Sequence, residues 1–212
     1  MSQSVFIVDD DPAVRDSISL WLSCHDYDTR CFADAKHFLG QVTQTLEGCI
    51  IADIRMPGMG GLELQAHLNK INCQLPLIFI TGHGTVPMAV EAIKNGALDY
   101  LRKPVDEMQL LQKVKEGFIT DSINNQKRQR SLQHQSRFKS LTKRELEVLE
   151  LVVAGASNKV IASGLGISHR TVEVHRAKVM LKLGAKTLPQ LVKSYLTMLE
   201  SSYQALPIKR PL

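Results

Sequence analysis

The 212-residue sequence predicts a doubly wound α/β domain with a five-stranded parallel sheet, followed by an all-α domain of four helices. Over residues 1–120, five short apolar segments alternate with five segments that have the spacing of amphipathic helices. This is the pattern of a parallel sheet covered on both faces. Residues 141–212 instead show helix start and stop signals at short intervals. Residues 121–140 are polar and contain neither Gly nor Pro, so we expect a partly helical linker there.

Turn signals bound each of the five expected strands. The central one, residues 49–53, is apolar until it reaches Asp53, which fits a strand buried on both faces. The second, residues 27–32, is less hydrophobic and is expected nearer an edge of the sheet. The other three strands are expected at 5–8, 77–81 and 99–102.

Five helices are expected to follow these strands. In the first, Asp11 is placed to cap a helix that begins at Pro12, with apolar residues at Val14, Ile18 and Leu22. The expected ranges are 12–24, 35–42, 62–69, a segment that starts near residue 87 and stops at 95–96, and 106–118.

The carboxyl ends of parallel strands meet at one edge of the sheet, where open α/β sheets place their sites. That edge is expected to gather Asp9, Asp10, Asp53, Thr81 and Lys103. Carboxylates this close repel each other, and a hard divalent cation relieves the repulsion; two carboxylates and a backbone carbonyl suit Mg²⁺. A carboxylate beside Mg²⁺ can attack phosphorus while a hydroxyl and an ammonium offset charge on the transferred oxygens. Asp53, Thr81 and Lys103 supply those groups.

Charge divides unevenly along the chain, although the net value is only +5. Residues 1–120 contain 10 basic and 15 acidic residues, whereas residues 121–212 contain 16 and 6. The acidic front half is therefore expected to bind cations, and the basic back half is expected to bind polyanions.

The four cysteines, Cys24, Cys31, Cys49 and Cys73, have no metal-ligand spacing and predict buried thiols in a reducing compartment. The sequence shows no signal peptide and no apolar run of membrane length. We therefore expect a cytoplasmic protein that does not span or contact a membrane.

Four segments of the first domain resemble the signature of bacterial two-component receiver domains, which implies a flavodoxin-like fold. The resemblance covers residues 4–120. The segments, in chain order, are Asp9-Asp10, Asp53-Ile54-Arg55-Met56-Pro57, Thr81-Gly82-His83-Gly84 and Tyr100-Leu101-Arg102-Lys103-Pro104.

The resemblance implies that a sensor histidine kinase transfers a phosphoryl group to Asp53. It also implies a Mg²⁺ site at this carboxylate. Asp10 would bind the ion directly, Asp9 would act mainly through coordinated water, and the backbone carbonyl of Arg55 would complete the site.

The same resemblance implies how the phosphoryl group is sensed. Thr81 would hydrogen-bond to it, Lys103 would pair with it, and Tyr100 would be an aromatic switch that turns inward. His83 would be a loop residue that tunes loss of the phosphoryl group. The peptide bond between Lys103 and Pro104 would be cis.

The segment from Thr81 to Ala92 is similar to the FixJ-like branch of response regulators, in which the fourth helix and the fifth strand form a dimer. We expect phosphorylation to create a homodimer through Val90 and Lys94, which point outward on the fourth helix, and through the nearby fifth strand. The expected inner face of that helix consists of Met88, Ala89, Ala92 and Ile93.

In the second domain, Thr142 and Glu145 form a capping box that opens the first helix, and Gly155 ends that helix. Ser157 and Ser168 are placed to cap the next two helices. Two short helices joined by a tight glycine turn in a basic domain indicate a helix-turn-helix, whose later helix enters the major groove. The expected later helices are 159–163, 168–183 and 188–199, with the turn at 164–166.

A second resemblance, over residues 138–200, is to the LuxR-type DNA-binding domain. It rests on Leu141 to Glu145, on Ser157-Asn158-Lys159 with Ile161-Ala162, and on Ile167 to Arg176, although Val160 replaces the usual Glu. The whole chain is thus similar to FixJ and NarL response regulators, which are transcription regulators. The resemblance implies double-stranded promoter DNA and RNA polymerase as partners.

The outer residues of the third helix are expected to divide between two kinds of DNA contact. Phosphate contacts, which set affinity, are expected from Arg170, Arg176 and Lys178, with Thr171 at the amino end of the helix. Contacts with base edges are expected from Glu173, Val174 and Ala177. His175 falls on the inner side and is expected to be a packed or phosphate-side histidine rather than a metal ligand.

Two alternatives remain open. The first is a Mg²⁺-dependent phosphatase with Asp9 as nucleophile and Asp11 as acid, although Ala13 occupies a position where such enzymes have Thr or Val. The second is a receiver that works without phosphorylation; the intact set of Asp53, Thr81 and Lys103 argues against it.

Overall fold

The computed structural model describes residues 4–43, 45–82 and 84–204. The chain divides into two compact units, residues 1–126 and 127–212. Among the described residues, no helix is both long enough and apolar enough to cross a lipid bilayer.

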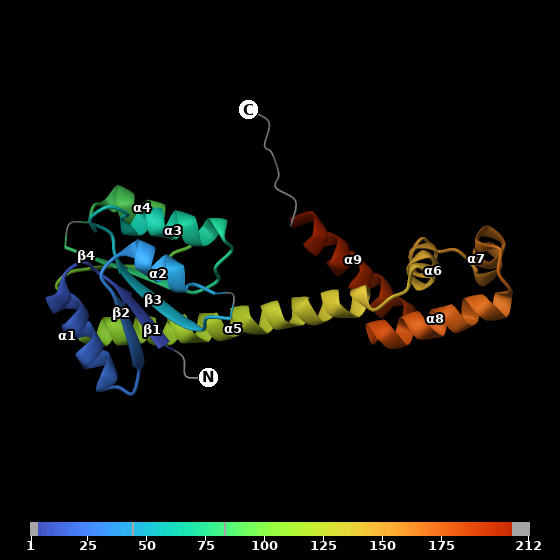
Figure 1. The fold of residues 1–212 in the computed structure, drawn as a ribbon, viewed down its shortest axis with the longest axis horizontal. Helices are drawn as coiled ribbons and strands as arrows, with labels where there is room; N and C mark the ends of the chain where they lie inside the picture. Colours follow the sequence, from blue (N-terminus) through green and yellow to red (C-terminus); the bar gives the residue numbers. More distant parts are fainter. Residues whose placement is uncertain (1–3, 44, 83, 205–212) are drawn as a thin grey trace, which may run out of the picture. The chain divides into compact units, whose positions relative to one another are not determined.

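Five parallel strands form the sheet of the first unit, in the order β2-β1-β3-β4-β5 (Figure 1). This order confirms the doubly wound, flavodoxin-like fold. β2 is an edge strand, as its weaker hydrophobicity predicts, and every residue of the central β3 is buried. The strands are β1 (Ser4–Val8), β2 (Asp28–Phe32), β3 (Gly48–Asp53), β4 (Leu77–Thr81) and β5 (Asp99–Arg102).

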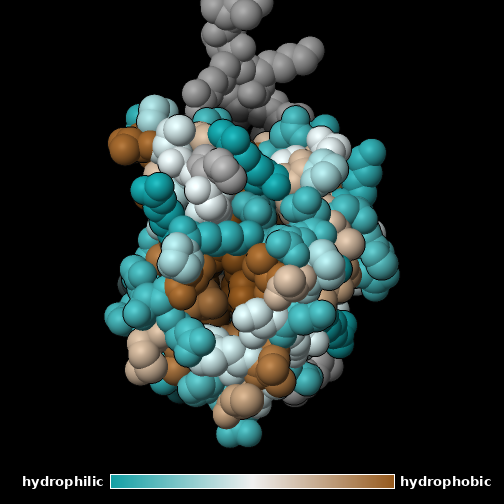
Figure 2. Space-filling view, turned by 90° about the vertical axis from the view of Figure 1, so that its left-hand side faces the viewer, coloured by the Kyte–Doolittle hydropathy of each residue, from teal (hydrophilic) through white to brown (hydrophobic). Residues whose placement is uncertain are grey.

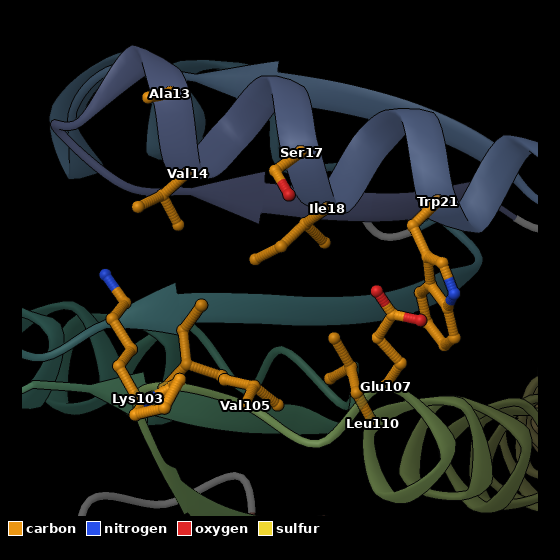
Figure 3. A pocket seen from close by; sticks show the side chains of 11 residues that line it. Ala13, Val14, Ser17, Ile18, Trp21, Lys103, Val105, Glu107 and Leu110 are labelled. Carbon is orange, nitrogen blue, oxygen red and sulfur yellow. The ribbon is translucent and has the colours of Figure 1, made fainter.

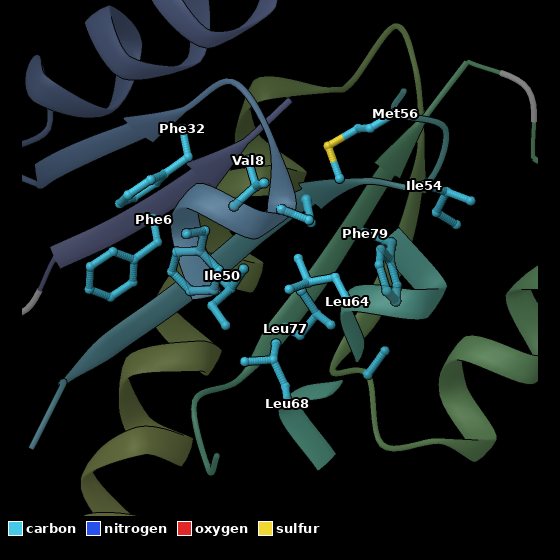
Figure 4. Close-up of a cluster of buried hydrophobic side chains, with 14 of the residues drawn as sticks. Phe6, Val8, Phe32, Ile50, Ile54, Met56, Leu64, Leu68, Leu77 and Phe79 are labelled. Atoms are coloured by element: carbon cyan, nitrogen blue, oxygen red, sulfur yellow. The ribbon is translucent and has the colours of Figure 1, made fainter. Parts of the chain in front are cut away.

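Helices cover both faces of this sheet. Strand residues alternate between the faces, so that Phe6 and Ile50 belong to one buried cluster and Ile7 and Ile51 to the other. Figure 4 shows the first cluster, in which Leu64 of α3 packs among strand side chains. The helices on that face are α2 (Ala35–Gln41), α3 (Gly61–Lys70) and α4 (Val86–Lys94); α1 (Pro12–Ser23) and the first part of α5 (Glu107–Lys139) cover the opposite face.

The helix α5 continues well beyond residue 118, through the whole stretch 121–139. That stretch lacks Gly and Pro and is rich in Gln, Lys and Arg, which favour helix. Within the first unit, the buried carboxylate of Asp121 accepts a hydrogen bond of 3.0 Å from the backbone N–H of Gly48. The Asn124 side chain donates one of 3.0 Å to the carbonyl of Gln74. These contacts hold this part of α5 against the amino-terminal edge of the sheet.

The expectation that all four cysteines are buried is wrong for two of them. Cys49 in β3 is buried, and burial raises the pKa of its thiol. Cys73 is half-buried, whereas Cys24 and Cys31 are exposed. Cys24 lies just past the end of α1, and Cys31 lies on the edge strand β2, so neither is covered by a neighbouring element.

The second unit is helical, as predicted. The capping box of Thr142 and Glu145 is present, and Ser157 and Ser168 cap the following two helices through their hydroxyl groups. Gly166 ends the helix that Ser157 caps, in the left-handed conformation with φ of 64°. The helices are α6 (Lys143–Val153), α7 (Asn158–Leu165), α8 (His169–Leu183) and α9 (Leu188–Gln204), around a core that includes Val148, Leu149, Ile161, Val172 and Val179.

Candidate functional site

Three carboxylates meet at the carboxyl ends of β1 and β3. Asp9 and Asp10 directly follow β1, and Asp53 is the last residue of β3. One oxygen of each lies within 4.8 Å of the others. Asp9 is fully buried, Asp53 is 8% exposed and Asp10 is exposed. The structure therefore brings together the three acids that the strand pattern places at this edge.

The ammonium of Lys103 bridges two of these carboxylates. Its Nζ lies 2.7 Å from Oδ2 of Asp9 and 3.0 Å from Oδ2 of Asp53. The backbone N–H of Lys103 donates to the carbonyl of Thr81 at 2.8 Å, which places the lysine beside the end of β4. The bond between Lys103 and Pro104 is cis, as the receiver resemblance implies. The ends of β1, β3, β4 and β5 thus converge on one polar cluster.

Burial and charge act in opposite directions on these groups. Burial raises the pKa of the Asp9 carboxyl, although hydrogen bonds from Lys103 and from the backbone of Asp11 oppose it. Burial by itself would lower the pKa of Lys103, but its hydrogen bonds to Asp9 and Asp53 outweigh that effect and raise it. Lys103 therefore stays protonated, and its single charge offsets only part of the charge of three carboxylates.

Backbone and guanidinium contacts orient the carboxylates. The N–H of Asp11 donates to Oδ1 of Asp9 at 2.9 Å, and the N–H of Arg55 donates to Oδ1 of Asp53 at 3.3 Å. Nη1 of Arg15 donates to the backbone carbonyl of Asp9 at 2.7 Å. Sequence reasoning did not select Arg15, because an Arg in the first turns of a helix belongs to none of the motifs. The only signal in the sequence was the position of Arg15, one helical turn after the capping residue Asp11.

This donor set fits a hard divalent cation. It consists of the carboxylates of Asp9, Asp10 and Asp53, which supply the oxygen ligands that Mg²⁺ prefers. Two such charges no more than 4.8 Å apart repel by at least about 3 kcal/mol at an effective dielectric of about 20. A divalent cation would remove that repulsion, which Lys103 only partly offsets.

Thr81 and Tyr100 lie beside this cluster on β4 and β5. Thr81 is fully buried. Tyr100 packs against the buried cluster on the α3 side of the sheet, and its shielded hydroxyl has no hydrogen-bond partner among the described residues. Burial raises the pKa of that hydroxyl. The ring therefore occupies an inward position in this structure. His83 lies outside the described residues.

A hollow with hydrophobic walls opens on the face that Figure 2 shows. Beside the acidic cluster, a cavity of about 420 Å³ lies between α1 and the start of α5 (Figure 3). Val14, Ile18 and Trp21 of α1 supply apolar lining, and Lys103 and Glu107 are its charged lining residues. The cluster of Asp9, Asp53 and Lys103 thus adjoins this largely apolar cavity.

The outward face of α4 is wider than the sequence predicts. Val90 is 46% exposed and Lys94 is exposed, in agreement with their expected orientation. Ile93, however, is 47% exposed, so its assignment to the inner face is wrong. The helix packs mainly through Ala92, which is fully buried, and its contact face is too narrow to include Ile93 as well.

In the second unit, most of the expected DNA-contacting residues lie on the open side of α8. Glu173, Val174, Ala177, Lys178 and Arg170 are exposed, and Thr171 is half-buried near the capped amino end. These side chains are therefore accessible to DNA if α8 lies in the groove of a duplex.

Arg176 and His175 are less accessible than their neighbours on α8. Arg176 is half-buried, and its Nη1 donates to Oδ1 of Asn158 on α7 at 2.8 Å. His175 is half-buried on the inner side, as expected, and its Nδ1 is shielded without a partner among the described residues. Arg176 thus holds α7 and α8 together, a contact that sequence spacing did not indicate.

Comparison with protein families gives two matches. Residues 5–115 match the response regulator receiver domain, and residues 139–195 match the LuxR family of bacterial regulatory proteins. The chain therefore belongs to the two-component response regulators, in the group that carries a LuxR-type helix-turn-helix and regulates transcription.

Relatives match along nearly the whole chain. The transcriptional regulatory protein FixJ of Azorhizobium caulinodans is 41% identical over 192 residues, which are 91% of this chain and 91% of FixJ. The transcriptional regulatory protein TdiR of Thauera aromatica is 38% identical over 191 residues, which are 90% of this chain and 84% of TdiR.

Solved structures agree with this assignment. The response regulator StyR superimposes with a TM-score of 0.82 at 40% identity, covering 93% of this chain and 100% of StyR. Full-length FixJ from B. japonicum gives a TM-score of 0.57 at 35% identity, covering 94% of this chain and 99% of that one.

Proposed function

We propose that Asp53 accepts a phosphoryl group from a sensor histidine kinase. A carboxylate oxygen of Asp53 forms the new P–O bond, the P–N bond of the donor phosphohistidine breaks, and the imidazole leaves with the electron pair. The observation that carries the proposal is the Lys103 ammonium, 3.0 Å from Oδ2 of Asp53, where it can offset charge on the transferred oxygens. Asp9 is fully buried, whereas Asp53 keeps some exposure, which favours Asp53 as the nucleophile.

Asp9, Asp10 and Asp53 are proposed to hold Mg²⁺, together with the backbone carbonyl of Arg55. The bound ion would supply positive charge to the phosphoryl oxygens during transfer. The spacing of the three carboxylates supports this part of the proposal, because Lys103 offsets only part of their mutual repulsion and a divalent cation would relieve the rest.

Thr81 and Tyr100 are proposed to transmit the effect of phosphorylation at Asp53. The Thr81 hydroxyl would hydrogen-bond to the phosphoryl group, and Tyr100 would then favour its inward position, which biases an existing equilibrium between two conformations. A shift from 1:99 to 99:1 needs about 5.5 kcal/mol of differential stabilisation, so partial switching is expected if the contacts supply less.

The active conformation is proposed to form a homodimer through Val90 and Lys94 on the exposed face of α4. The two α8 helices of the dimer would then read two half-sites of promoter DNA spaced about one helical turn apart. RNA polymerase is proposed as a further partner of the DNA-bound dimer. Residues 121–140 would link the domain that accepts the phosphoryl group to the domain that binds DNA. Phosphate contacts are assigned to Arg170, Thr171, Arg176 and Lys178, and base contacts to Glu173, Val174 and Ala177.

The test compares the protein with its Asp53→Asn variant, in which the carboxylate is lost but the shape is kept. Both are treated with acetyl phosphate and Mg²⁺, incubated with fragmented genomic DNA, and recovered with the fragments they bind. The treated protein should enrich a defined set of promoter fragments, and the variant should not. Equal enrichment by the untreated protein and by Asp53→Asn would show a regulator that works without phosphorylation.

A further inference from the structure

Gly84, in the loop between β4 and α4, lies directly against the ring of Tyr100. A Cβ atom on residue 84 would overlap the hydroxyl oxygen of Tyr100 and would lie 2.7 Å from its Cζ. It would also lie 2.8 Å from Cγ2 of Thr81. Carbon atoms in favourable contact stay about 3.5 to 4.0 Å apart. The tyrosine ring therefore occupies the space that any side chain at position 84 would need.

The ring has little freedom to yield while it stays inward. It packs against the buried cluster that includes Phe79 and Ala92, and its hydroxyl is shielded from solvent. That hydroxyl has no hydrogen-bond partner among the described residues, and an unpaired buried hydroxyl is unfavourable. Among the described residues, Tyr100 is thus held inward by packing and by no hydrogen bond of its hydroxyl, so that a competing side chain would displace it outward.

We propose that Gly84 is a positioning residue for the aromatic switch, because its missing side chain is the space into which Tyr100 turns. This inference rests on the proposed role of Tyr100 and adds a second position that decides whether the inward state exists. The three atoms nearest to a Cβ at position 84 belong to Tyr100 and Thr81, and none of them belongs to Asp53 or Lys103. A side chain there should therefore uncouple dimerisation from phosphorylation without preventing phosphorylation.

Gly82 provides a matched control in the same loop. A Cβ on Gly82 meets nothing within 4 Å, whereas the same atom on Gly84 meets Tyr100. Gly82→Ala and Gly84→Ala make the same chemical change and remove the same backbone freedom from the loop. A difference between them is then due to the contacts of residue 84 with Tyr100 and Thr81, which the exposure of Tyr100 and a Tyr100→Leu background separate.

The experiment uses the full chain labelled with 3-fluorotyrosine, before and after treatment with acetyl phosphate and Mg²⁺. Fluorine NMR reports the solvent exposure of Tyr100, whose resonance is identified by its loss in Tyr100→Phe. The original protein and Gly82→Ala should show a shielded Tyr100, and Gly84→Ala an exposed one. At equal phosphorylation of Asp53, Gly84→Ala should dimerise at least about tenfold more weakly, since coupling between sites commonly spans about 5- to 150-fold.

Any of three results would overturn the inference. The first is a Tyr100 that is as shielded in Gly84→Ala as in the original protein. The second is a Tyr100 that is exposed in the original protein both before and after phosphorylation. The third is full phosphorylation-dependent dimerisation of Gly84→Ala with Tyr100 exposed. If acetyl phosphate leaves the original protein unlabelled, the proposed function fails, and the NMR comparison of the untreated proteins still decides the steric claim.

A second variant covers the case in which Gly84→Ala folds poorly. Tyr100→Leu removes the hydroxyl and the ring atom that residue 84 would meet. If the contact with Tyr100 causes most of the loss, Gly84→Ala should lower the thermal unfolding midpoint clearly more in the original background than in the Tyr100→Leu background, where only the contact with Thr81 remains. An equal loss in both backgrounds would place the cause elsewhere and contradict the proposal.

Discussion

The ammonium of Lys103 donates a hydrogen bond of 3.0 Å to the carboxylate of Asp53, a residue 50 positions earlier in the chain. The two meet because β3, β4 and β5 are neighbours in the sheet and end at the same edge. The same ammonium lies 2.7 Å from Asp9 at the end of β1. The order of the strands is therefore what converts separate motifs into one site.

Replacing Lys103 with Met should slow phosphorylation of Asp53 by acetyl phosphate. The change removes the positive charge that is placed to offset charge on the transferred oxygens, and the loss of one such group typically costs about 10²- to 10³-fold in rate. Intact-protein mass spectrometry over time measures the rate. Lys113→Met is the matched control, because Lys113 pairs instead with Asp99 and Glu116. An unchanged rate in Lys103→Met would remove Lys103 from the proposed chemistry.

Replacing Asp10 with Asn should weaken Mg²⁺ binding by about tenfold, which corresponds to about 1.4 kcal/mol. Asp10 is one of the three acids within 4.8 Å of one another, so the change removes one of the negative charges that attract the ion. Isothermal titration with MgCl₂ measures the affinity. Asp16→Asn, on α1 and outside this cluster, should bind Mg²⁺ like the original protein. Equal affinities for all three proteins would place the ion elsewhere.

The ion pair between Glu145 and Lys182 should make the second unit sensitive to acid. Nζ of Lys182 lies 2.6 Å from Oε2 of Glu145, and this hydrogen bond lowers the pKa of Glu145 to about 2 from its ordinary 4.5. Because the folded-state pKa is the lower one, the stabilisation is complete above pH 4.5 and is lost as the pH falls towards 2. Hydrogen exchange of α6 and α8, followed by mass spectrometry between pH 6 and 3, should show faster opening at the acid end.

Lys182→Met should remove most of this pH dependence. It should also destabilise the unit at pH 6 by about 1 to 3 kcal/mol, because Glu145 is buried and would lose its charged partner. Lys186→Met, which replaces an exposed lysine of the same unit, should behave like the original protein. A pH dependence of exchange that survives in Lys182→Met would assign it to other groups.

Val90→Glu should abolish phosphorylation-dependent dimerisation and leave phosphorylation of Asp53 intact. The residue is 46% exposed on α4, so a carboxylate is tolerated in the monomer but would be buried without a partner in a dimer. Ile93→Glu should act similarly, since Ile93 is also exposed. Analytical ultracentrifugation at equal phosphorylation measures the effect. Leu20→Glu, at an exposed position on α1, serves as the control, and dimers formed by Val90→Glu would move the interface elsewhere.

Two substitutions on α8 should affect DNA binding in different ways. Lys178→Ala should weaken binding to all sequences and reduce the slope of log K against log salt concentration by about 0.9, the value for one phosphate contact. Glu173→Ala should instead relax the preference at one base pair, by about 1 to 3 kcal/mol. Binding titrations at several salt concentrations, with single-base variants of a bound site, distinguish the two. Identical effects of both changes would contradict the division between phosphate and base contacts.

Much of the fold is predictable because each strand carries a local signal. The run that ends at Asp53 is apolar on both faces, and the cap at Asp11 begins α1 where the sequence places it. The extension of α5 to Lys139 was less apparent, since residues 121–139 have no continuous apolar face and helix propensity is a weak signal alone. The exposure of Ile93 was missed for a similar reason, because spacing defines a helix face but not its width.

Three positioning contacts were beyond sequence reasoning. Arg15 reaches the carbonyl of Asp9 only because α1 begins directly after the acidic pair, and Arg176 meets Asn158 only when α7 and α8 are packed. The contact between Gly84 and Tyr100 likewise depends on the path of a loop over the sheet edge. Residue types indicated the chemistry of the site, whereas these positioning contacts appear only in three dimensions.

The most direct test of the central claim is to locate the modification that acetyl phosphate leaves on the protein. After treatment in the presence of Mg²⁺, the acyl phosphate is reduced with borohydride, and peptide mass spectrometry identifies the converted aspartate. The account predicts a single converted residue, Asp53, with no conversion in Asp53→Asn or when Mg²⁺ is removed by a chelator. Conversion at Asp9 or Asp10, or none at any aspartate, would contradict it.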